Sequence, residues 1–271
     1  MPLPAVRMQR ASGEARLTLA RTAGRTAIAE LYQEGAAKIR MPRPLPGGAA
    51  EAVPINTAGG LTGGDRMRWE IAAQAGTRAV ITTQACERLY RALTGEPARV
   101  ATHLSVGART RLDWLPQETI LFDGCALVRT LDADLAPDAT LLAVETIVFG
   151  REAMREDVHH ASFRDRWRIR RDGRLLFADD LHFEGDIACQ LARPAIANGA
   201  RAIATLGYFG ADAEAKCERV RARFPGIAVS AFDGKLIARL GAGESYSLRK
   251  SLIPLLDMLC AAGSLPKAWA L

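Results

Sequence analysis

The chain has 271 residues, of which 49% are hydrophobic, enough for a substantial core in one large domain or two small ones. Its 36 lysines and arginines exceed its 30 aspartates and glutamates, giving a net charge of +6. This mild excess favours acidic partners. No basic run is interleaved with aromatic residues, so we expect no nucleic-acid binding.

No apolar run reaches the roughly 18 residues that a membrane-spanning helix requires, and residues 1–10 lack the apolar stretch of a secretory signal. The five cysteines are widely scattered and form no CxxC pair. This spacing argues against a structural zinc site and against a disulfide framework. We therefore expect a protein of the reducing cytoplasm that makes no membrane contact.

Most of the chain is predicted to form short β-strands. Met67–Ile71 alternates strictly between apolar and polar residues, which is the period of a half-buried strand. Other predicted strands are Arg16–Ala20, Arg78–Thr83, Thr110–Leu115, Ala139–Phe149, Arg164–Arg170 and Leu175–Leu181. The Asp172-Gly173 pair between the last two indicates a hairpin turn.

Helical patterns occur only near the C-terminus. Asp212–Phe224 is rich in charged residues, and Glu244–Ala262 carries leucines at helical spacing. Pro254 lies inside the second segment and should kink the helix or mark its first turn. The sequence therefore predicts a single, mainly β domain over residues 1–271, with two α-helices concentrated in about 211–262.

A glycine-rich run, Asn56–Asp65, has four glycines within six residues and ends in a carboxylate. Gly59 and Gly64 match the glycines of a P-loop, but Asp65 and Arg66 replace its lysine and hydroxyl residue. A loop that presents a carboxylate suits a cation or a protein partner better than a nucleotide. The alternative is a turn between two strands, with Asp65 as a local hydrogen-bond acceptor.

No catalytic motif is complete. The sequence has neither GxSxG nor HExxH, and His182-Phe183-Glu184 is not followed by the PCxxC half of a zinc-deaminase signature.

Several carboxylates remain as candidates for chemistry. Glu145 interrupts an apolar run, and a carboxylate in a buried strand costs roughly several kcal/mol unless it is paired or binds a metal. It either pairs with an arginine, lies on an exposed strand face, or lines a path for a cation. Oxygen and imidazole ligands with few thiols suit a borderline divalent ion such as nickel, bound weakly and then released.

Five segments together resemble the urease accessory protein family UreD, also called UreH. In chain order they are Asn56–Asp65, Thr82–Ala85 with Tyr90-Arg91, Leu115–Phe122, Glu145 with Phe149–Met154, and Leu265–Trp269. The resemblance covers nearly the whole chain. Two departures stand out: Arg155 lies where the family usually has glycine before Glu156, and Lys267 replaces the usual arginine.

This resemblance implies a non-catalytic maturation factor that binds the urease apoprotein and the accessory proteins UreF and UreG. The complex would couple GTP hydrolysis by UreG to nickel delivery, with nickel as a transient ligand and no permanent cofactor. The implied fold is mainly β, with stacked sheets in a helix-like arrangement and a small helical part.

The resemblance also implies an internal polar tunnel for nickel. Its candidate residues are Asp65, Glu145 and Glu184, with Thr83 and Glu87 as weaker lining positions. Two other functions stay open. One is a docking scaffold that conducts no metal, and the other is a hydrolase that uses paired carboxylates, such as Asp65 with Glu184.

Overall fold

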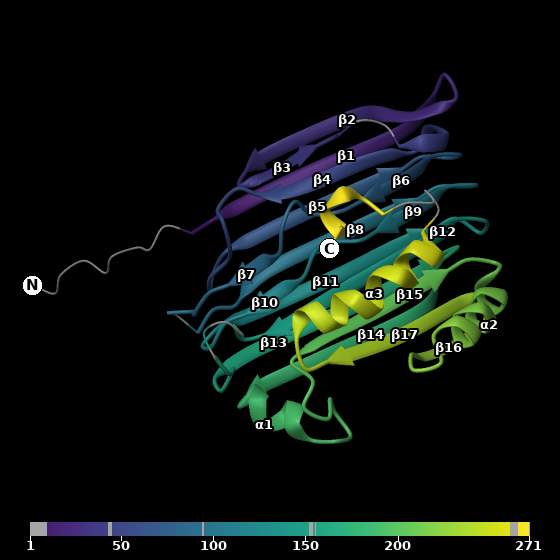
Figure 1. Cartoon of the computed structure of the whole chain (residues 1–271). Coiled ribbons are helices and arrows are strands. Elements are labelled where there is room, and N and C mark those ends of the chain that lie inside the picture. The colour runs from purple at the N-terminus through teal and green to yellow at the C-terminus, as the bar shows by residue number, and fades with distance from the viewer. Residues whose placement is uncertain are drawn as a thin grey trace, which may run out of the picture.

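Two β-sheets stacked face to face make up most of the molecule, with helices on the outer side of one of them (Figure 1). The computed structural model describes residues 10–42, 45–93, 95–151, 154, 156–260 and 265–270. Arg155, one of the two departures from the family pattern, lies outside these residues.

Sheet I has one continuous strand order. Its strands in space are β14 (Arg174–Gly185), β13 (Ala161–Arg171), β11 (Ala126–Leu135), β8 (Ala98–Val106), β5 (Arg66–Ala73), β1 (Ser12–Thr22) and β2 (Arg25–Gly35).

Sheet II has a main path and a short branch. The main path is β16 (Ala228–Phe232), β17 (Lys235–Ala242), β15 (Ala202–Phe209), β12 (Thr140–Phe149), β9 (Arg111–Trp114), β6 (Arg78–Ile81), β4 (Ala50–Asn56) and β3 (Ala37–Arg40). In the branch, β10 (Thr119–Leu121) pairs with β12 and with β7 (Glu87–Leu89).

Between β4 and β13 the chain winds from one sheet to the other. The strands β4, β6, β9 and β12 are parallel neighbours in sheet II, and β5, β8, β11 and β13 are parallel neighbours in sheet I. Successive coils therefore stack on one another as in a β-solenoid. This confirms the helix-like arrangement of stacked sheets that the resemblance implied.

Each strand predicted from alternation is present, with small shifts at its ends. The β13–β14 hairpin turns at Asp172 and Gly173, whose φ angles are 50° and 72°. Positive φ at both central residues is what a two-residue turn between twisted strands requires.

The two predicted C-terminal helices are confirmed as α2 (Ala213–Arg223) and α3 (Ser245–Leu259), and the short α1 (Ile187–Ala192) is an addition. Pro254 lies in the interior of α3. None of the helices in the described part of the chain combines the length and apolar character needed to cross a bilayer.

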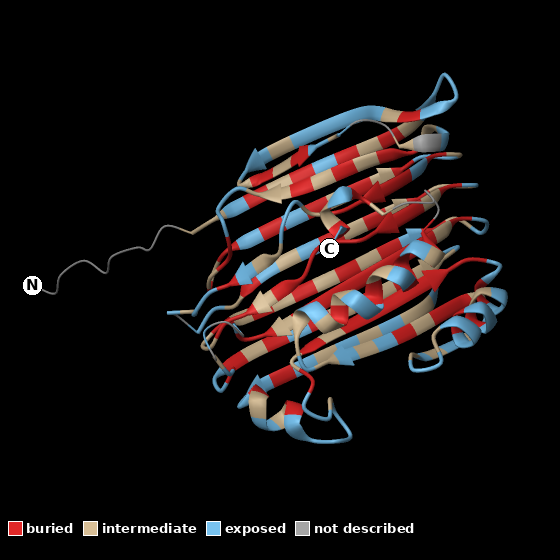
Figure 2. Ribbon diagram, viewed as in Figure 1, coloured by how far each residue is buried: buried red, intermediate tan, exposed pale blue. Residues whose placement is uncertain are grey.

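Strand β12 is buried on both faces, because sheet I covers one face and the helices cover the other (Figure 2). Leu142 and Val144 pack toward α2 and α3, whereas Leu141 and Ala143 pack between the sheets. The two-residue period of a strand then directs Glu145 into the space between the sheets.

The packing of α3 on sheet II gives a stability prediction. Leu256 is fully buried in this interface, so Leu256→Ala should lower the free energy of unfolding by about 2–5 kcal/mol through the cavity that it leaves. Leu175, which is 57% exposed, provides the matched control, and its change to alanine should cost less than about 0.5 kcal/mol. Equal losses in urea titration would contradict this packing.

Candidate functional site

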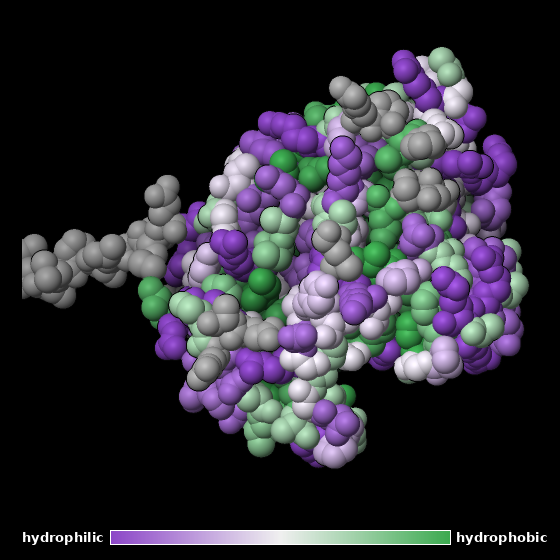
Figure 3. All heavy atoms as spheres, viewed as in Figure 1, coloured by the Kyte–Doolittle hydropathy of each residue, from purple (hydrophilic) through white to green (hydrophobic). Residues whose placement is uncertain are grey.

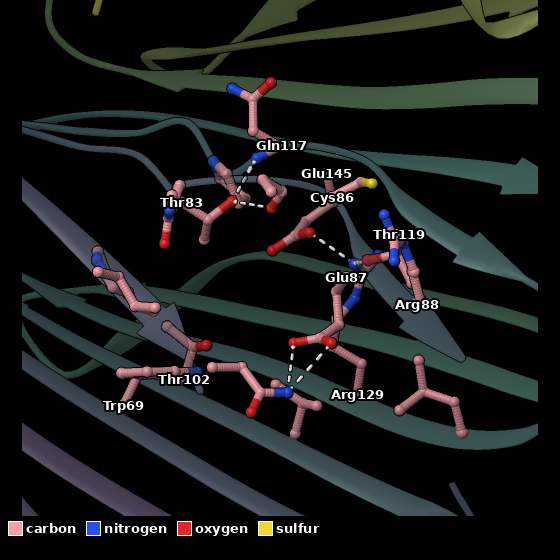
Figure 4. Close-up of a pocket in the computed structure, with 18 of the residues that line it drawn as sticks. Trp69, Thr83, Cys86, Glu87, Arg88, Thr102, Gln117, Thr119, Arg129 and Glu145 are labelled. Carbon is pink, nitrogen blue, oxygen red and sulfur yellow. Dashed lines mark hydrogen bonds and ion pairs between the residues drawn. The ribbon is translucent and has the colours of Figure 1, made fainter. Parts of the chain in front are cut away.

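A cavity of about 230 Å³ lies between the two sheets (Figure 4). Sheet I contributes β5, β8 and β11 to its wall, and sheet II contributes β4, β7, β9, β10 and β12. The side chains on which its chemistry depends are Asn56, Trp69, Thr83, Glu87, Trp114, Thr119, Arg129 and Glu145. Gln84, Ala85 and Arg88 are exposed at one part of the lining, while Arg129 and Glu145 are buried at another.

The glycine-rich loop and the Thr82–Arg91 segment form one part of this wall. The Leu61 N–H donates to the Arg88 carbonyl at 2.8 Å, and the Tyr90 N–H donates to the Leu61 carbonyl at 2.8 Å. A Cβ at Gly60, where φ is 150°, would lie 2.4 Å from the Tyr90 ring. Glycine is required there because two backbone segments approach closely.

Glu87 lies on this wall, and both of its carboxylate oxygens accept from the Asn56 side-chain amide, at 3.2 and 3.1 Å (Figure 4). Burial raises the pKa of Glu87, and the hydrogen bond from Asn56 acts in the opposite direction. Thr83 is half-buried, accepts from the Gln117 N–H at 2.9 Å and donates to the Ala85 carbonyl at 3.1 Å.

At the buried part of the cavity, one guanidinium meets two carboxylates. Arg129 on β11 donates from Nε and Nη2 to the two oxygens of Asp165 on β13, at 3.0 and 2.7 Å. Its Nη1 donates to the Thr119 hydroxyl at 2.9 Å and forms an ion pair with Glu145 Oε2 at 2.6 Å. We call Arg129, Asp165 and Glu145 the interior ion cluster. It links the two sheets.

Glu145 is 5% exposed and is held on both oxygens, since the Trp114 indole N–H donates to Oε1 at 3.0 Å. The pKa of Glu145 is raised to about 7: burial is the largest cause and raises it, Arg129 lowers it, Asp165 raises it and the Trp114 hydrogen bond lowers it. Burial by itself would lower the pKa of Arg129, but the two carboxylates raise it above its ordinary value.

Asp65 and Glu184 do not line this cavity. Asp65 is buried and accepts from the Ala11 and Thr62 N–H groups, both at 2.8 Å, so it is the local acceptor of the turn alternative. The Glu184 side chain is 73% exposed on β14, with His182 Nε2 at 3.7 Å.

The pair of Asp65 and Glu184 that a hydrolase would need is not formed. Asp65 immediately precedes β5, and three strands separate β5 from β14 in sheet I. The two strands are therefore four spacings apart, and at about 4.8 Å per spacing the two backbone positions lie roughly 19 Å apart across the sheet. This separation is too large for the two groups to act as general acid and general base on the same bond.

The sequence-predicted residues Thr83, Glu87 and Glu145 are thus brought to one cavity, although no group of three or more His, Cys, Asp or Glu side chains in the described residues could hold a metal ion. Sequence reasoning missed Arg129 and Asp165. Each occupies the inward position of its strand between buried apolar residues, and that interruption of the alternation is the signal that could have found them.

Two other segments of the family resemblance also meet in space. Arg249 on α3 donates to the Gln117 and Glu118 side chains, both at 2.8 Å, and to the Ala268 carbonyl at 3.2 Å. The Trp269 indole N–H donates to the Leu115 carbonyl at 3.0 Å. These contacts fix the Leu115–Phe122 segment, from which Gln117 and Thr119 reach the cavity lining.

Comparison with known proteins identifies one family. The model of the family described as UreD urease accessory protein matches residues 11–270. The chain is 52% identical over 267 residues to the urease accessory protein UreD of Rhizobium leguminosarum bv. viciae, covering 98% of this chain and 97% of the relative. The protein of the same name from Sinorhizobium medicae is 48% identical over 274 residues, covering 98% of each chain.

The raised pKa of Glu145 predicts a pH-dependent stability. From about pH 4.5 to about pH 7 the unfolded chain has lost this proton while the folded chain keeps it, so stability falls as pH rises through this window. Because Glu145→Gln removes the titration, the wild type should lose stability relative to this variant between pH 5 and 7 and then level off.

Urea titrations at pH 5, 6, 7 and 8 would measure this difference. The exposed Glu184→Gln provides the control and should follow the wild type at every pH. A difference between wild type and Glu145→Gln that stays constant with pH would contradict the assignment of this titration to Glu145.

Proposed function

The chain belongs to the UreD family of urease accessory proteins, and on this premise we propose that it acts in urease maturation as a non-catalytic carrier of nickel to the urease apoprotein. In this proposal it works in the cytoplasm in a complex with UreF and UreG. GTP hydrolysis belongs to UreG, and nickel is cargo rather than a resident cofactor.

The observation that carries the proposal is the cavity between the sheets, whose lining includes two glutamates among other polar and apolar side chains. Glu87 lies near exposed lining residues, and Glu145 lies at the buried part. Carboxylate, hydroxyl and amide oxygens from Glu87, Thr83 and Asn56 are ligands of modest strength for a borderline divalent ion. Weak successive sites favour transfer, because a complete ligand cage would retain the ion.

The pKa of both glutamates is raised, so metal binding at either one would compete with protons. A carboxylate must be deprotonated to serve as a metal ligand, and binding therefore releases a proton. This competition supports a carrier whose affinity for nickel changes with the protonation of these two glutamates.

A docking scaffold without metal conduction is the second candidate. On the helix side, a groove of about 370 Å³ lies between the end of α2, β17 and α3, and hydrophobic surface is visible beside α3 (Figure 3). Its apolar lining residues include Phe224, Ile227, Leu240, Leu248 and Pro254. Tyr246 is 60% exposed on the same helix. A surface of this kind suits a protein partner whether or not metal passes between the sheets.

Two matched glutamate variants distinguish these candidates. We expect Glu145→Gln to reduce the nickel content of urease severalfold, because it removes the buried carboxylate and preserves its shape. Glu184→Gln should leave the nickel content unchanged, since that side chain is exposed away from the cavity. Urease is purified from cells that carry each variant, the wild type or no chain. The nickel content per urease molecule is then measured by elemental mass spectrometry.

Loss of nickel without the chain, but full nickel with Glu145→Gln, would favour the docking scaffold. Full nickel in every strain would contradict a role in urease maturation. Asp65→Ala is not suited to this test, because Asp65 holds two backbone N–H groups and its loss would act through folding.

A further inference from the structure

The interior ion cluster contains a permanent cation beside the carboxylate that the proposed function assigns to metal. Arg129 is 5% exposed, and a guanidinium stays protonated at any physiological pH. Its Nη1 lies 2.6 Å from Glu145 Oε2. The Trp114 indole N–H already holds Oε1, so a cation that binds Glu145 through Oε2 has to displace the guanidinium.

The two carboxylates hold Arg129 unequally. Asp165 accepts from two guanidinium nitrogens in a fork, which is the strong and directional geometry for this pair. Glu145 meets Nη1 alone, and Nη1 also donates to Thr119. Glu145 is thus the partner that can exchange, while Asp165 keeps the guanidinium in place.

The cavity wall shows the same asymmetry. Arg129 and Glu145 both line the cavity, whereas Asp165 does not. A cation inside the cavity therefore reaches Glu145 and meets the charge of Arg129 at close range. Asp165 stays behind the guanidinium, where it offsets that charge after Glu145 has changed partner.

From this geometry we propose that Arg129 is a built-in competitor for the metal, which keeps Glu145 a weak and reversible site for a divalent cation. The inference rests on the proposed function and adds a positioning residue to it. A divalent ion displaces Nη1 from Glu145, and Nη1 returns to Glu145 when the ion leaves. Arg129 itself does not ligate the metal.

Direct metal binding to the full chain tests this role. Arg129→Met removes the competing charge, so one equivalent of nickel(II) should bind about tenfold more tightly or better, because a nearby like charge opposes the ion in the wild type. Nickel sulfate titrated into the purified chain by calorimetry gives the affinity. Arg129→Met/Glu145→Gln should lose the gain, which assigns the added site to Glu145.

Two further variants separate charge from folding. Arg129→Lys keeps a positive charge and should bind nickel as weakly as the wild type. Arg129→Met/Asp165→Asn removes a buried cation and a buried anion together, so that it leaves one buried carboxylate without a cation where Arg129→Met leaves two, and it serves if Arg129→Met alone fails to fold. It leaves Glu145 without a competitor and should again bind nickel more tightly than the wild type.

The proposal is overturned if the folded Arg129→Met or Arg129→Met/Asp165→Asn chain binds nickel no better than the wild type. It is also overturned if the gain persists without Glu145, or if Arg129→Lys gains as much as Arg129→Met. A normal nickel content of urease with Glu145→Gln would contradict the proposed transport of nickel through the cavity. The role of Arg129 as a competitor would still be decided by the calorimetry. The two ideas therefore fail separately.

Discussion

The ion pair between Arg129 and Asp165 constrains the space between the sheets. The two residues are direct register partners on adjacent parallel strands. A slip of one residue would turn one of the two side chains to the outer face and separate the pair. Removing one partner of such a pair typically costs about 3–5 kcal/mol. The contact therefore holds β11 and β13 in register and keeps the guanidinium beside Glu145 at the buried part of the cavity.

The sequence predicted the parts of the fold that follow from local periodicity. Strict alternation located β5, and the Asp172-Gly173 pair located the β13–β14 turn. Stacking of the coils could not be predicted in this way, because parallel pairing joins segments distant in the chain. For the same reason Glu145 could be recognised as unusual, and Arg129 and Asp165 could have been, but no local pattern could assign the three to one another. Local pattern also did not reveal that Glu184 is exposed on the edge strand of sheet I.

Within the glycine-rich run, glycine serves contact between two parts of the chain. Gly60 lets the loop pack against the Tyr90 ring and the Arg88 carbonyl, and Asp65 closes the turn by accepting backbone N–H groups. The run thereby brings Asn56 to Glu87. The glycine-rich run is therefore a fixed part of the cavity wall and not a ligand-binding loop. It contributes to the site by positioning Asn56 beside Glu87.

The winding of the chain between the sheets also has a kinetic consequence. Strand β1 pairs in parallel with β5, and Ser12 lies opposite Arg66, so the first coil closes only after more than fifty intervening residues have been made. Topologies dominated by such distant contacts fold slowly and expose unpaired strand edges while they do so. During synthesis, the strand edges of the early coils stay unpaired until the later coils have been made. The yield of native protein should therefore depend on whether a binding partner or general chaperone protects these edges before the last coils and α3 are complete.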